Sequence, residues 1–208
     1  MNLHDPMGHA APSPGQVVPR RWPRWALLLM GLAAVVVVIR SWAALEEHWD
    51  YLREERPASR VEYDTLSTQW TEKHLRQRYA GLPLHCAAYQ GALNVDRYCS
   101  LRVSSHNGLP AMFVVYFLRQ DRLLLANVAV PWWRHDEAYE HLTQTLGQPF
   151  RSQLLPSAFV RLHGWALPDG AALFFNRERS LLSLDWSSIQ WSSAEHCPGG
   201  RCFSTPRP

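Results

Sequence analysis

One uncharged, apolar segment constrains this chain more than any other feature. Residues 25–39 contain no charged, amide or hydroxyl side chain, and they lie between Arg24 and Arg40. Such a run is typical of a membrane-spanning helix or of the apolar part of a secretion signal. The remaining four fifths of the chain is then expected to be a domain delivered to one side of a membrane.

The flanks of the segment favour an uncleaved signal anchor over residues 24–45. The strictly apolar part is shorter than the roughly 20 residues that a crossing helix needs, but the long side chain of Arg40 can reach the headgroups. Tryptophans suited to the two membrane interfaces flank it: Trp22, Trp25 and Trp42. The alternative is a signal peptide cleaved near Ala43.

The basic residues beside the segment predict its orientation. Arg20, Arg21 and Arg24 precede it, whereas only Arg40 follows closely. Because basic residues stay in the cytoplasm, we expect a bacterial inner-membrane protein with a cytoplasmic N-terminus and a periplasmic C-terminal domain. Residues 1–23 are expected to form a disordered cytoplasmic tail.

The net charge of +3 is also located at this segment. The four arginines around the segment, offset by Asp5, account for all of it, and Lys73 is the only lysine. A nucleic-acid-binding domain would instead concentrate lysine and arginine on one face. We therefore expect the inner membrane and envelope proteins as partners, and no nucleic acid.

Four cysteines, Cys86, Cys99, Cys197 and Cys202, all follow the anchor. An even number in an oxidising compartment predicts disulfides, and proximity in sequence favours Cys86–Cys99 and Cys197–Cys202 among the three pairings. Zinc ligation by His196 with the last two cysteines fits less well, because the other pair lacks zinc-site spacing. A thiol-redox role also lacks its usual Cys-x-x-Cys spacing.

A helical stalk is expected at residues 46–58. Trp42, Leu45, Trp49 and Leu52 recur at spacings of three and four, which places them on one helix face. The spacing favours a stalk that packs on its own domain through this face. The alternative is a homodimer in which two chains pair through these residues.

The rest of the chain shows a helix followed by strands, twice over. The first helix is expected to begin at Ser59, which with Glu62 has the form of a capping box, and to end near Gly81. The second is expected to be capped by Asp136 and to end near Gly147. Strand-like runs lie at 84–89, 98–104, 111–118, 123–130, 150–154, 158–167, 171–175 and 181–189.

These patterns predict an α+β fold with one transmembrane helix, a helical stalk and an exported domain of two helix-plus-antiparallel-sheet repeats. After the stalk, we expect a first α+β unit at 59–133 and a second at 134–195. A disulfide loop with a tail is expected at 196–208.

The two halves can be aligned with each other. Gly81-Leu82-Pro83 matches Gly147-Gln148-Pro149, and Leu125, Val130 and Trp132 match Leu184, Ile189 and Trp191. Over residues 60–192 this order, with the run from Leu142 to Pro149, resembles the small outer-membrane assembly lipoproteins of the small-protein-A type and the β-lactamase inhibitory proteins. No cysteine follows the apolar segment, so the lipid attachment site of the lipoproteins is missing. The resemblance implies a binding protein without catalysis.

Trp132, Trp133 and Arg134 are the candidate interaction residues. Side chains alternate between the two faces of a strand, so the two tryptophans cannot both easily face one core. An exposed tryptophan beside an arginine is typical of binding hot spots. The alternative is that both tryptophans pack under the following helix.

No recognisable catalytic motif is present, and we expect no catalytic, cofactor-binding or metal-binding residues. The predicted function is a membrane-anchored, non-enzymatic protein-binding or envelope-assembly module. An immunity or inhibitor protein directed against a toxin is the alternative. The rival class, a periplasmic hydrolase or thiol-redox protein, requires convergence in one pocket of at least three of four histidines: His135, His141, His163 and His196.

Overall fold

The structure is a computed structural model that describes residues 23–149, 151–155, 160–179, 186–197 and 202–203. Residues up to Ile39 and residues from Arg40 onward form two compact units. The predicted disordered tail lies outside the described residues except for Pro23.

Helix α1, Arg24–Arg53, runs without interruption through the predicted anchor and into the predicted stalk, and it ends at Arg53, before the expected stalk limit at residue 58. Among the described residues, however, no helix is long and apolar enough to cross a membrane, so the span predicted at residues 24–45 is not supported. The uncharged run between Arg24 and Arg40 is shorter than the roughly 20 residues that a crossing requires.

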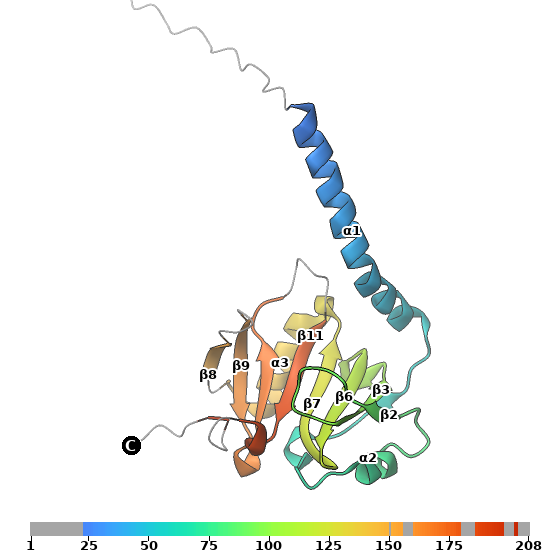
Figure 1. The fold of residues 1–208 in the computed structure, drawn as a ribbon. Helices are drawn as coiled ribbons and strands as arrows, with labels where there is room; N and C mark the ends of the chain where they lie inside the picture. The colour runs from blue at the N-terminus through green and yellow to red at the C-terminus, as the bar shows by residue number, and fades with distance from the viewer. Residues whose placement is uncertain (1–22, 150, 156–159, 180–185, 198–201, 204–208) are drawn as a thin grey trace, which may run out of the picture. The chain divides into compact units, whose positions relative to one another are not determined.

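The core of the second unit is one eight-stranded antiparallel sheet in the order β2-β3-β6-β7-β11-β10-β9-β8 (Figure 1). Its strands are β2 His85–Ala88, β3 Arg97–Arg102, β6 Phe113–Arg119, β7 Arg122–Val130, β8 Arg151–Leu155, β9 Val160–Ala166, β10 Ala172–Asn176 and β11 Ser187–Ser192. Strands β2, β3, β6 and β7 form one meander, and β8 to β11 form another. The α+β class is thus confirmed.

The two meanders join through their last strands, β7 and β11. The pairing extends from Val130 opposite Ser187 to Leu125 opposite Ser192. Because both strands are central, neither meander has a free edge at the junction. The two halves therefore share one sheet.

Helices α2, Glu72–Arg78, and α3, His135–Leu146, pack on the same face of this sheet. Leu75 of α2 and Leu142 of α3 belong to one buried cluster with Val114 and Ile189. Apolar residues four apart on α3 give that helix its buried face. In Figure 1, α3 lies behind the strands.

The prediction of a helix beginning at Ser59 is wrong. Ser59 lies in β1, Ala58–Ser59, and its Oγ lies 2.8 Å from Nδ1 of His106. The helix α2 begins only after Thr71, whose Oγ1 accepts a hydrogen bond from the His74 backbone N–H. Ser59 is thus engaged by tertiary contacts and cannot cap a helix.

The segment before α2 belongs to a three-stranded sheet that the sequence did not reveal. Its order is β1-β4-β5, with β4 at Ser105–His106 and β5 at Leu109–Pro110. These strands are too short to show an alternating pattern. Short 3-10 turns complete the described elements: η1 Tyr63–Thr65, η2 Trp132–Arg134, η3 Pro168–Gly170 and η4 Ala194–His196.

Two further boundaries differ from the predictions. Asp136 does not cap α3 but lies inside its first turn, where it pairs with Arg179. The last strand runs over Ser187–Ser192, because the pairing with β7 continues to Ser192. Most of the predicted 181–189 run precedes this strand, and residues 181–185 lie outside the described residues.

The stalk also contacts the domain through a different face from the predicted one. The Tyr51 hydroxyl donates to the Ser104 carbonyl at 2.9 Å, and Arg102 pairs with Glu47 at 3.3 Å and with Glu54 at 3.0 Å. The domain surface offers a guanidinium and a carbonyl here, which complement the polar face of the helix. The apolar face formed by Trp42, Leu45, Trp49 and Leu52 stays exposed.

Gly147 provides a test of the turn after α3. Its φ of 83° and ψ of −171° lie in a region that essentially only glycine adopts, although an added Cβ would meet no atom within 4 Å. We expect Gly147→Ala to lower the free energy of unfolding in urea by about 1–3 kcal/mol. The control is Gly31→Ala in α1, which has equally open surroundings and which we expect to cause no loss. Equal effects of both changes would contradict this account.

His106 makes the stability of the domain depend on pH. Burial lowers its pKa to about 4, whereas an unfolded histidine titrates near 6.5. As the pH falls from 6.5 to 4, the unfolded chain takes up the proton first, so we expect a loss of stability of up to about 3 kcal/mol. His106→Gln should reduce this slope in urea titrations. An unchanged slope in His106→Gln would contradict the assignment.

Candidate functional site

Helices α2 and α3 both leave the opposite face of the sheet uncovered. We call it the open face. Its members are half-buried and project to the same side, because residues paired directly across antiparallel strands share a face. They are Tyr98, Ser100, Phe113, Val115, Phe117, Asn127, Phe174, Asn176, Ser188 and Gln190.

A continuous row of paired residues crosses the middle of the open face. Val115 on β6 is opposite Asn127 on β7, Asn127 is opposite Gln190 on β11, and Gln190 is opposite Phe174 on β10. Ser100 on β3 extends the row by pairing with Val115. None of these five side chains is charged, so a partner could cover the row without burying an unpaired ion.

The polar groups on the open face are partly held by one another. The Ser188 hydroxyl hydrogen-bonds with the Asn127 side-chain oxygen, and the Ser188 backbone N–H donates to Asn176 Oδ1 at 3.0 Å. These bonds restrict the orientation of both amides. Fixed amide and hydroxyl groups on a strand surface give an incoming chain donors and acceptors with set directions.

Aromatic side chains from neighbouring loops border the open face. Tyr89, in the loop after β2, meets Phe117 edge to face with ring centroids 5.6 Å apart. Trp186 meets Phe113 in the same way at 4.9 Å. Phe203 lies 5.6 Å from Phe174. The open face therefore combines a polar, uncharged centre with aromatic residues near its borders.

The two predicted disulfides are present, and both predicted pairings are confirmed. Cys86–Cys99 joins β2 to β3 at directly paired positions, and Cys197–Cys202 closes a loop after β11. The Cys202 sulfur also approaches the Ser192 carbonyl at 3.7 Å. This second disulfide thus holds the segment that carries Phe203 near the open face.

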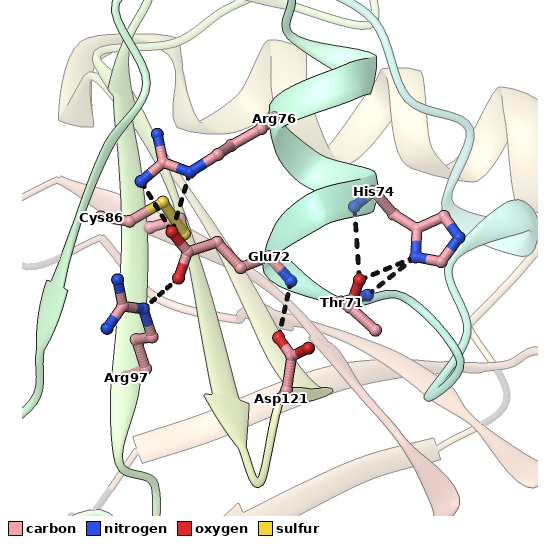
Figure 2. Close-up of a disulfide and its surroundings, with 8 residues drawn as sticks. Thr71, Glu72, His74, Arg76, Cys86, Arg97 and Asp121 are labelled. Atoms are coloured by element: carbon pink, nitrogen blue, oxygen red, sulfur yellow. Dashed lines mark hydrogen bonds and ion pairs between the residues drawn. A yellow bond between two sulfur atoms is a disulfide. The ribbon is translucent and has the colours of Figure 1, made fainter.

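A cluster of charged residues surrounds the first disulfide (Figure 2). Glu72, the first residue of α2, pairs with Arg97 of β3 and with Arg76 one helical turn later. The Arg97 hydrogen bond holds the pKa of the Glu72 carboxyl below its usual range. Asp121 accepts a hydrogen bond from the Glu72 backbone N–H at 2.9 Å. The cluster therefore attaches the start of α2 to the sheet.

The same cluster holds three potential metal ligands. One Glu72 oxygen and the sulfurs of Cys86 and Cys99 lie within 4.8 Å of one another. Both sulfurs are bonded in the disulfide, and the carboxylate is occupied by Arg76 and Arg97. These residues do not fit a metal in the oxidised protein. The sequence did not predict the part played by Glu72, because α2 begins later than expected.

The predicted interaction residues occupy η2, between β7 and α3. Trp133 is 37 % exposed, and its ring contacts that of His48 on α1 edge to face at 5.0 Å. Trp132 is half-buried and lies against Trp133, with centroids 5.9 Å apart. Arg134 pairs with Glu137 at 2.7 Å. Their role in binding stays a prediction.

Of the four histidines that would mark a catalytic centre, only two lie close together. His135 stacks on Phe175, which is paired across the sheet with His163, so these two are neighbours. His141 lies about 9 Å from His135 along α3. There it lines a cavity of about 360 Å³. His196 lies on η4. Fewer than three converge.

Two serine–histidine pairs occur among the described residues, and both are buried. Ser187 Oγ lies 2.7 Å from His135 Nδ1, and the corresponding distance for Ser59 and His106 is 2.8 Å. Burial lowers the pKa of both imidazoles. A nucleophile must reach its substrate, and these hydroxyls face the core, so the pairs are structural hydrogen bonds.

Comparison with protein-family models, with curated proteins and with solved structures yields no match for this chain. The open face is therefore interpreted from its own geometry.

Removal of each disulfide tests its contribution to the domain. Cys86 and Cys99 are 13 residues apart, whereas Cys197 and Cys202 are 5 apart. The chain-entropy model gives losses of about 3 kcal/mol for the first pair and about 2 kcal/mol for the second. We expect that order in urea unfolding of the two paired cysteine-to-alanine variants. A larger loss for the second pair would show that its loop stabilises the domain by contacts beyond the crosslink.

Proposed function

We propose that this chain is a non-enzymatic protein-binding module that acts in an oxidising compartment and binds its partner with the open face. The observation that carries the proposal is the uncharged row from Ser100 to Phe174, which both helices leave uncovered.

The composition of the open face suits association with another protein. Protein interfaces are depleted in charged residues at their centre and enriched in aromatic residues. The row through Val115, Asn127 and Gln190 has no charge, and Phe113 and Phe117 lie on either side of Val115 along β6. Because the open face lies on a sheet held by backbone hydrogen bonds, its residues lose little conformational freedom when a partner binds.

The disulfides support a location outside the cytoplasm. Structural disulfides form and persist in oxidising compartments, and both pairs here are closed. We propose the bacterial periplasm, with envelope proteins as partners. An inhibitor or immunity protein that binds a toxin would use the open face in the same way. The doubled order of helix and meander supports this reading through the resemblance to inhibitory proteins.

An enzymatic role is the less favoured alternative. It would place the chemistry in the cavity of about 360 Å³ lined by Tyr63, His141 and Arg60. Burial raises the pKa of the Tyr63 phenol, so this group is a poor general base near neutral pH. The lining contains neither a serine nor a cysteine. The open face is therefore the better candidate.

Photocrosslinking at matched glutamines tests the open face. A photoreactive residue is placed at Gln190 on the open face or at exposed Gln144 on α3, and the full chain is irradiated in the cells that produce it. We expect one discrete crosslinked product from position 190 and none from position 144. Val115→Arg, combined with the reactive residue at 190, should abolish the product, because it places a charge in the centre of the row.

Two outcomes would contradict the proposal. Equal crosslinking from positions 190 and 144 would show that the partner does not prefer the open face. A product that survives Val115→Arg would place the contact elsewhere. The compartment is tested separately by thiol alkylation in intact cells, where labelling of all four cysteines would exclude an oxidising location. Urea unfolding of Val115→Arg controls for loss of the fold, and we expect a change below about 1 kcal/mol at this half-buried site, because the long arginine side chain can extend into solvent.

A further inference from the structure

The last turns of α1 present two opposite faces. Tyr51, Glu47 and Glu54 contact the domain through Ser104 and Arg102. Successive helix residues are rotated by about 100°. The apolar residues of the same turns therefore point roughly 150° away from these contacts.

We call these apolar residues the α1 stripe. They are Trp42, Leu45, Trp49 and Leu52, which are 66, 46, 54 and 64 % exposed. Arg53 lies over the Trp49 ring at 4.3 Å, yet more than half of that side chain remains accessible. Four large apolar side chains in one row are rarely left in water on a monomer.

The surroundings of the stripe argue against burial in hydrocarbon. Glu46, Glu47 and Asp50 alternate with its members along the same turns of the helix. Three carboxylates over two turns would be costly in a bilayer core. The partner of the stripe must therefore cover apolar side chains while the carboxylates stay in water.

We propose that the α1 stripe pairs with the α1 stripe of a second copy of this chain, in parallel. Spacings of three and four along a helix form a seam that packs against another helix. The same spacing continues toward the N-terminus through Leu28, Gly31, Val35 and Val38. One helix thus carries a heptad pattern over most of its length.

The accessible surface area of the α1 stripe is sufficient for a helix pair. From the exposed fractions, the four side chains offer roughly 500 Å² per chain, taking aromatic side chains at about 250 Å². A pair would bury about 1,000 Å² in total, which is at the lower limit of a specific interface. Pairing that continues along the N-terminal part of α1 would enlarge it.

The charges beside the stripe favour the parallel arrangement. In an antiparallel pair centred on the stripe, Glu46 residues of the two copies would lie on the same side and about 3 Å apart along the axis. Such like charges repel. In a parallel pair they lie on opposite sides of the seam. The open face lies on the domain and takes no part in this contact.

Single new cysteines test the pairing. All four native cysteines are in disulfides, so an added thiol reports on its own position. In the full-length protein in mild detergent, we expect Leu45→Cys to form a crosslinked dimer on oxidation at least about fivefold faster than Asp50→Cys, which lies about 140° around the helix. Positions 45 and 49 would face each other only in an antiparallel pair. Mixing Leu45→Cys with Trp49→Cys should therefore give no faster crosslinking than Leu45→Cys alone.

Several outcomes would overturn the proposal. Equal rates for Leu45→Cys and Asp50→Cys would remove the stripe as the contact, and faster crosslinking in the mixture would make the pair antiparallel. Sedimentation should show a dimer for the native chain and a monomer for a variant with both Trp49→Glu and Leu52→Glu. A native monomer, or a dimer that persists in this variant, would contradict the proposal. Both substituted positions are exposed, so urea unfolding of the domain should be unchanged.

Discussion

The pairing of β7 with β11 is the interaction on which the rest of the second unit depends. It joins the ends of two meanders, so that Leu125 to Val130 and Ser187 to Ser192 form the centre of one sheet. Without it, each meander would expose an unpaired edge. With it, α2 and α3 share a single buried face, and a row of uncharged residues on the opposite face continues from β3 to β10.

The two faces of the sheet carry different kinds of side chain. One face carries the apolar core, with Tyr116, Trp191 and Phe175 fully buried. The other carries the half-buried residues of the open face. Under the proposed function, stability and recognition would depend on alternate residues of the same strands. A change on the open face need not disturb the core, although the two are only one residue apart.

The sequence predicted most strands because their signals are local. The alternation in Phe113–Arg119 and Arg122–Val130, and the Gly147 turn after α3, do not require knowledge of partners. The start of α2 was missed because Ser59 bonds to His106, a contact between residues 47 apart. No residue of the open face was singled out from the sequence, because its central row exists only once the strand register is fixed.

The first disulfide has a consequence for the loop between β2 and β3. Cys86 and Cys99 lie on either side of this loop, whose residues 90–94 are exposed. Exposed loop tips are preferred sites of proteolysis. A cut there would leave the two pieces of chain covalently attached and β2 still held beside β3. In a compartment that contains proteases, the molecule could be nicked at its most accessible loop and yet keep the sheet whole.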